Sequence, residues 1–255
     1  MFAYRKLAAI GALALVAALP GVTAATNSWG NYHWARTSNP FTLNVGVTVT
    51  ATWSPILNTT VVDWSKSTVL DLTRAQGANS TTRKKCNPTA GRVEVCNNTY
   101  GYNGWLGVAQ IWASGSHITQ GTVRLNDSYF NTSTYSSSAW RNMVSCQEVG
   151  HTLGLDHQDT DFNNTNLNTC MDYTNDPSTN QQPNQHDYDE LGLIYGHADS
   201  TTTVGSAVPN ASGAGVGSWN AEFGRMVAHS GDGRTSTFVR DLGAGQRIIT
   251  HVIWA

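Results

Sequence analysis

The chain has 255 residues, of which 13% are charged and 40% are hydrophobic, and its formal net charge is −2 at pH 7. This balance excludes the strongly basic surface of a typical nucleic-acid-binding protein and gives no reason to expect an anionic membrane as a partner. The length allows one domain with a substantial core and a small additional segment. We expect a monomer that binds neither nucleic acid nor a membrane.

The first 24 residues have the pattern of a secretory signal peptide. Arg5 and Lys6 precede an apolar run over residues 7–19, which is followed by Pro20 and a small-residue site ending at Ala24. The run is shorter than the ~20 apolar residues that a membrane helix requires. We therefore expect residues 1–24 to be removed and the mature protein to be secreted and extracellular.

Strand and helix patterns alternate along the first part of the mature chain. Alternating apolar residues predict a strand over residues 41–49, and apolar residues at roughly helical spacing predict a helix over residues 61–72. Two strands, over residues 106–112 and 118–126, are joined by the turn sequence SGSH, and a helix follows over about residues 138–153. This order predicts an α/β (α+β) fold with a mixed sheet.

The second part contains a long loop, a helix and a tail. Residues 158–185 are rich in Asn, Asp and Thr with little periodicity, and PNQHDYDELGLIYGH predicts a second helix. Gly, Ser and Thr dominate residues 199–217, which we interpret as a linker between a main domain, residues 25–198, and the tail. The tail, residues 218–255, predicts a small β-rich appendage with GDG and GAG turns.

The four cysteines of an exported chain are expected to form disulfides. Three pairings are possible, and sequence alone does not decide among them. We favour the pairing that needs no long-range assumption, which joins Cys86 to Cys96 and Cys146 to Cys170.

The stretch CQEVGHTLGLDH carries the candidate chemistry. On a helix, Gln147 and His151 are four residues apart and lie on one face, with Glu148 beside them. Gly154 can take the left-handed conformation that ends a helix and turns the chain, which would bring His157 back to the same point. Neutral imidazoles are good zinc ligands, and Glu148 could accept a proton from water at such a site. The pattern therefore predicts a zinc centre.

QEVGHTLGLDH resembles the extended zinc-binding sequence of the metzincin metallopeptidases, with Gln147 where that family has its first histidine. The resemblance implies a zincin domain with a twisted sheet, an active-site helix and a C-terminal helix. It also implies that His151 and His157 bind Zn²⁺, that Glu148 is the general base, and that Gly154 makes the turn.

CMDY resembles the Met-turn of the same family. The resemblance places Met171 beneath the zinc and makes Tyr173 an assisting catalytic residue, as in astacins and serralysins. More faintly, HITQGTVRLN, residues 117–126, resembles the edge strand that binds substrate in this clan. The tail from Ser218 has no counterpart in the family.

Gln147 leaves three hypotheses open. Its side-chain oxygen could be the third zinc ligand, with lower affinity than an imidazole. Another histidine, His117 or His186, could complete the site. The site could also be degenerate, leaving a scaffold that binds no metal tightly.

Five aspartates surround the motif. They could orient the histidines, bind a structural Ca²⁺ ion, or simply be solvated loop residues. These residues are Asp156, Asp159, Asp161, Asp172 and Asp176.

The leading hypothesis is a secreted zinc-dependent endopeptidase that acts on peptide or protein substrates. The alternative is a catalytically weak or inactive metzincin-like protein that binds a peptide or another partner. In a third class, the tail acts alone as a carbohydrate- or surface-binding module.

Overall fold

The computed structural model describes residues 27–206 and 223–255. The predicted signal peptide and residues 207–217 of the predicted linker lie outside this range. Within it, no helix combines the length and the apolar character needed to cross a bilayer.

The strands of the described chain form one mixed sheet, in the order β3-β2-β4-β6-β5-β9-β8-β7, and β1 pairs with the start of β6. The strands β2, β3, β4 and β6 are parallel, whereas β5, β9, β8 and β7 join by antiparallel pairing. The bounds are β1 His33–Trp34, β2 Phe41–Thr48, β3 Leu70–Gln76, β4 Val93–Asn98, β5 Trp105–Ser114, β6 His117–Asn126, β7 Arg225–His229, β8 Thr235–Gly243 and β9 Gln246–Trp254.

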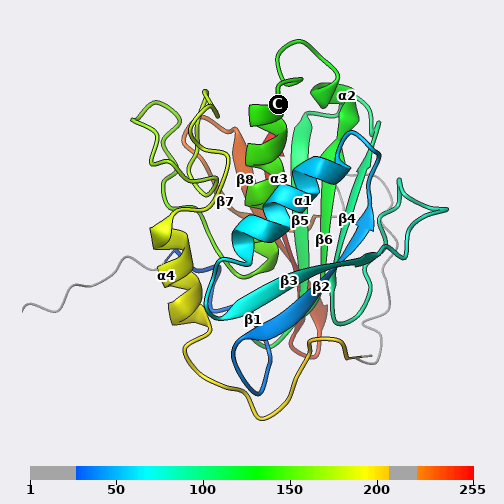
Figure 1. Ribbon diagram of the computed structural model, residues 1–255, viewed down its shortest axis with the longest axis vertical. Helices are drawn as coiled ribbons and strands as arrows, with labels where there is room; N and C mark the ends of the chain where they lie inside the picture. Colours follow the sequence, from blue (N-terminus) through cyan, green and yellow to red (C-terminus); the bar gives the residue numbers. More distant parts are fainter. Residues whose placement is uncertain (1–26, 207–222) are drawn as a thin grey trace, which may run out of the picture.

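The helices α1, Ser54–Trp64, and α3, Ser138–Thr152, lie on one face of this sheet (Figure 1). The helix bounds are α1 Ser54–Trp64, α2 Asp127–Phe130, α3 Ser138–Thr152 and α4 Gln185–Ile194. The side chain of Ser137 accepts the Trp140 N–H at the start of α3. A reciprocal capping box between Asn184 and Asp187 starts α4.

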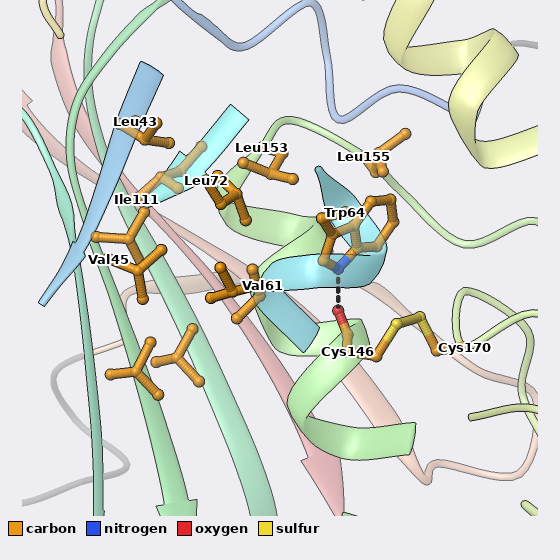
Figure 2. Close-up of a cluster of buried hydrophobic side chains, with 14 of the residues drawn as sticks. Leu43, Val45, Val61, Trp64, Leu72, Ile111, Cys146, Leu153, Leu155 and Cys170 are labelled. Atoms are coloured by element: carbon orange, nitrogen blue, oxygen red, sulfur yellow. Dashed lines mark hydrogen bonds between the residues drawn. A yellow bond between two sulfur atoms is a disulfide. The ribbon is translucent and has the colours of Figure 1, made fainter. Parts of the chain in front are cut away.

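The main core lies between the sheet and the helices α1 and α3. Figure 2 shows Val45 and Ile111 of the sheet facing Val61 and Trp64 of α1. The indole N–H of Trp64 donates to the carbonyl oxygen of Cys146 in α3 at 3.0 Å. This bond satisfies a polar group in an apolar layer and fixes α3 against α1.

The predicted α/β class with a mixed sheet is confirmed. The predicted strand 41–49 is β2, the strands joined by SGSH are β5 and β6, the helix 138–153 is α3, and the last predicted helix is α4. Both favoured disulfides, Cys86–Cys96 and Cys146–Cys170, are present.

The predicted helix over residues 61–72 is wrong in its second half. The helix α1 ends at Trp64, and residues 70–76 form β3, parallel to β2. Leu70 and Leu72 are buried while Asp71 between them is exposed, which is the alternation of a strand. The short apolar run fits both periods, and pairing with β2 decides for the strand.

The described part of the tail, residues 223–255, forms β7, β8 and β9, which extend the main sheet. The strand β9 runs antiparallel to β5 along nearly the whole length of β5. The strand β6 pairs with both β4 and β5, so the expectation that residues 117–126 form an edge strand for substrate is wrong. The outer edge of β5 is occupied by β9.

Candidate metal centre

The helix α3 carries the central residues of the motif close against the sheet. A Cβ atom at Gly107 of β5 would lie 2.6 Å from Val144 Cγ1 and 2.8 Å from Glu148 Oε1. Only a residue without a side chain permits this approach. Gly107 thus lets α3 press the Glu148 carboxyl group against β5.

The chain turns sharply after α3, as the sequence predicts. Gly154 has φ +96°, and a Cβ atom there would lie 2.1 Å from the Tyr32 carbonyl oxygen. The turn returns the chain so that His157 meets His151, with their Nε2 atoms 3.1 Å apart.

A third histidine, His251 of β9, completes this cluster. Its ring centroid lies 4.0 Å from that of His151 and 4.7 Å from that of His157. Each of the three imidazoles offers a nitrogen within 4.8 Å of the other two, and all three residues are buried.

Hydrogen bonds leave one nitrogen of each motif histidine facing the other. The Nδ1 atom of His151 lies 2.9 Å from the Leu155 carbonyl oxygen, and that of His157 lies 3.1 Å from Asp156 Oδ1. Each Nδ1–H therefore donates away from the cluster, which leaves Nε2 with its lone pair inside.

Burial keeps the three imidazoles neutral. It lowers the pKa of His151 and His157 well below the ordinary value, and nearby His251 lowers both further. Burial also lowers the pKa of His251 to about 3. Neutral imidazole is the form that binds metal ions.

Buried polar atoms without a hydrogen-bond partner among the described residues include Gln147 Oε1, Glu148 Oε1 and His251 Nε2. Buried polar groups are normally satisfied, so orphaned atoms beside three neutral imidazoles point to a missing bound group. The donor set of three nitrogens with a carboxylate nearby suits a zinc ion with an open position.

The side chain of Glu148, in α3, reaches His251 of β9. Its Oε2 atom is 3.4 Å from His251 Nδ1. Burial raises the pKa of Glu148 to about 8, against the lowering effects of His151 and of a hydrogen bond from the Ala109 backbone. The carboxyl group therefore holds a proton more readily than an exposed glutamate does.

The other predicted site residues lie around the cluster in distinct roles. Gln147 donates its amide N–H to the Cys170 carbonyl at 2.8 Å. Met171 is fully buried, and its Sδ would lie 2.7 Å from a Cβ atom at Gly150 in α3. The Tyr173 ring lies 4.2 Å from that of His157, and its hydroxyl accepts a hydrogen bond from Thr235.

His117 and His186, the two histidines proposed from sequence as the first zinc ligand, contact other residues instead. His117 faces Asp199, with Nε2 3.3 Å from Oδ1, and His186 lies 4.0 Å from Asp187 Oδ1. Sequence reasoning missed His251. A signal was available, because in RIITHVIWA the alternation of a strand places His251 on the same side as Ile249 and Ile253.

Of the five predicted aspartates, Asp156 contacts a site histidine. Asp172 instead accepts hydrogen bonds from the Leu167 backbone and the Asn180 side chain. Within residues 27–206 and 223–255, the groups with metal-ligand spacing contain histidines and Asp199, and none is built from these five loop aspartates. The calcium hypothesis gains no support.

No protein-family model matches the chain, and neither does any curated protein. Several solved structures are similar to it, and two of them are described here. The first is high choriolytic enzyme 1, a hatching enzyme zinc-protease from the medaka fish Oryzias latipes, with 10% identity and a TM-score of 0.35 over 64% of this chain and 94% of the enzyme. The second is myroilysin, with 14% identity and a TM-score of 0.33 over 64% of this chain and 86% of myroilysin.

Proposed function

We propose that the protein is a secreted zinc-dependent endopeptidase whose metal is held by His151, His157 and His251. The observation that carries the proposal is the convergence of three buried imidazoles beside the Glu148 carboxyl group. A tetrahedral zinc ion with bonds of about 2.0–2.1 Å separates its ligand atoms by about 3.3 Å. The 3.1 Å between the Nε2 atoms of His151 and His157 is close to that separation.

His251 fits the third ligand position better than Gln147 does. An imidazole nitrogen is a stronger zinc donor than an amide oxygen. Gln147 Oε1 and His251 Nε2 both lack a hydrogen-bond partner among the described residues. His251 belongs to the group of three histidine nitrogens within 4.8 Å of one another, whereas the Gln147 amide N–H holds that side chain to the Cys170 carbonyl. We assign Gln147 the role of joining α3 to the Met171 segment.

When bound, zinc supplies a Lewis acid that polarises the scissile carbonyl group and lowers the pKa of water. Glu148 would accept a proton from the attacking water and pass it to the leaving amine. Its Oε2 atom faces His251 Nδ1, and its Oε1 atom has no hydrogen-bond partner among the described residues. Tyr173 would hold the His157 ring by a tilted ring contact, and it could donate to the substrate only after leaving Thr235.

A second candidate function, a catalytically weak or inactive protein, is favoured by one specific observation. The strand β9 covers the edge of β5, and Glu148, His151 and His251 are almost fully buried. A peptide substrate would need access that this arrangement restricts. In that case zinc would serve to hold the tail in place.

Cleavage assays on the mature chain separate the two candidates. A mixture of fluorogenic peptides should be cleaved, and a chelator should stop the cleavage. The variant Glu148→Gln should lose roughly 10²- to 10⁴-fold in kcat/KM while keeping its zinc. A matched control, Asp71→Asn on an exposed position of β3, should keep full activity. Zinc-loaded protein without chelator-sensitive cleavage would leave the inactive candidate.

A further inference from the structure

A second cluster of metal-ligand side chains shares no residue with the first. Asp199 Oδ1 lies 3.5 Å from His33 Nε2, 3.3 Å from His117 Nε2 and 3.6 Å from His197 Nε2. The Nε2 atoms of His33 and His197 are 3.3 Å apart. The nitrogens of His33 and His117 and the Asp199 oxygen therefore form one group, and the His197 nitrogen lies beside two of its members.

These separations match the edges of a zinc coordination tetrahedron. Zinc bonds of about 2.0–2.2 Å to nitrogen and oxygen place neighbouring ligand atoms about 3.3–3.6 Å apart. Four of the six ligand pairs have separations in that range. The ligand atoms of His33, His117 and Asp199 all lie within 4.8 Å of one another.

Outer hydrogen bonds orient the ligand atoms toward one another. His33 Nδ1–H donates to the Asn31 carbonyl at 2.8 Å, which leaves Nε2 free to bind a metal. Arg36 donates its backbone N–H and its guanidinium to Asp199 Oδ2, at 3.2 and 2.8 Å. The other oxygen, Oδ1, is thereby directed at the histidines. Such outer contacts are typical of protein metal sites.

The backbone brings the ligands together from three distant segments. Parallel pairing of β1 with β6 sets His33 directly beside His117. The segment after α4 is held to the β1 segment, because the Asp199 N–H donates to the Arg36 carbonyl and the Thr203 N–H to the Ala35 carbonyl. The cluster thus lies where the N-terminal segment, the β5–β6 turn and the end of the predicted main domain meet.

We propose that His33, His117, His197 and Asp199 bind a structural zinc ion. Four protein ligands close the coordination shell, as in structural rather than catalytic zinc sites. The ion would join the three segments and add its binding free energy to the stability of the fold. It could enter from solvent, because the His197 side chain is half-exposed and lines, together with His33, a pocket of about 230 Å³.

Metal analysis of the purified mature protein tests this site apart from the first one. Elemental analysis should find two zinc equivalents per chain. The variants His117→Asn and His197→Asn should each bind one zinc equivalent. Both variants should fold, because these side chains are partly exposed. His151→Asn should also bind one, from the other site. The control His229→Asn, an exposed histidine of β7, should keep two.

A stability readout separates a structural ion from an adventitious one. Zinc added to metal-free protein should raise the Tm, and this gain should shrink in His197→Asn but not in His229→Asn. Cobalt bound to His151→Asn should give the visible absorption of a tetrahedral site. Equal zinc content in wild type and His197→Asn, or a Tm gain that His197→Asn leaves unchanged, would overturn the proposal. Neither result depends on peptidase activity, so failure of the proposed function would be seen separately.

Discussion

His251 Nδ1 lies 3.4 Å from Glu148 Oε2, although 103 residues separate the two in sequence. The register between β9 and β5 produces this contact, since His251 pairs directly with Ala109 of β5, the strand against which Glu148 packs at Gly107. The tail and α3 therefore both contact β5. Because successive side chains of a strand face opposite sides, a shift of the register by one residue would remove the contact.

Exchanging Thr250 and His251 should abolish zinc binding at this centre. The double variant Thr250→His/His251→Thr keeps the composition but moves the imidazole to the opposite face of the sheet. We expect one zinc equivalent fewer than in wild type, measured by elemental analysis after circular dichroism has verified folding. An exchanged variant with full zinc content would show that the position of His251 is immaterial.

Gly150 should be intolerant of a side chain. A Cβ atom there would lie 2.7 Å from both Met171 Sδ and Trp64 Cζ2. We expect Gly150→Ala to lower the free energy of unfolding by about 1–3 kcal/mol, because the core has no room. Gly192→Ala in α4 is the control, since nothing lies within 4 Å of its Cβ position. That change should raise stability by about 0.5–1 kcal/mol. Urea unfolding measures both, and equal effects would contradict the packing described.

The two disulfides should differ in their effect on the metal. The Cys146–Cys170 bond ties α3 to the Met171 segment across a separation of 24 residues, and the Cys86–Cys96 bond spans 10. Replacing either pair by alanine should cost about 2–4 kcal/mol of stability. Loss of Cys146–Cys170 should also weaken zinc binding in a chelator competition, whereas loss of Cys86–Cys96 should not. Weaker zinc binding after loss of Cys86–Cys96, but not after loss of Cys146–Cys170, would contradict this role of the Cys146–Cys170 bond.

Asp187 should make stability fall as pH rises. Burial raises its pKa, against the lowering effects of hydrogen bonds from Thr169 and the Asn184 backbone. A raised folded-state pKa means that the protonated form is favoured by folding. The stabilisation that Asp187 contributes is therefore complete below its unfolded-state pKa of about 3.9. It is lost as pH rises through the folded-state pKa.

The variant Asp187→Asn keeps an oxygen acceptor and has no charge to lose. The stability of wild type relative to this variant should decline between pH 4 and pH 7, as followed by urea unfolding at several pH values. A difference that grows with pH would mean that the charged carboxylate is the favoured form.

The sequence predicts the local parts of the fold well because their signals are local. The Ser137 cap and the apolar pattern define α3, and the positive φ of Gly154 follows from the turn that the motif requires. The second half of the predicted helix 61–72 fails because a seven-residue apolar pattern fits two periods, and only the pairing with β2 distinguishes them.

The candidate site combines residues that are close in sequence with residues from distant segments. Glu148, His151 and His157 lie within ten consecutive residues, so spacing alone brings them together. His251 and the second cluster depend on strand pairing between distant segments, β5 with β9 and β1 with β6. Alternation places His251 on the inner face of its strand, but nothing in the sequence says which strand lies beside it.

The identity of the third zinc ligand is the central claim, and zinc affinity of two single variants tests it most directly. We would measure chelator competition on mature protein carrying His197→Asn, so that the second cluster does not contribute. His251→Asn should lower the affinity by more than about 100-fold, the upper range for losing an outer-shell partner. Gln147→Ala should change it by less than about 10-fold. Retained affinity in His251→Asn, with a large loss in Gln147→Ala, would contradict the account and return the ligand role to Gln147.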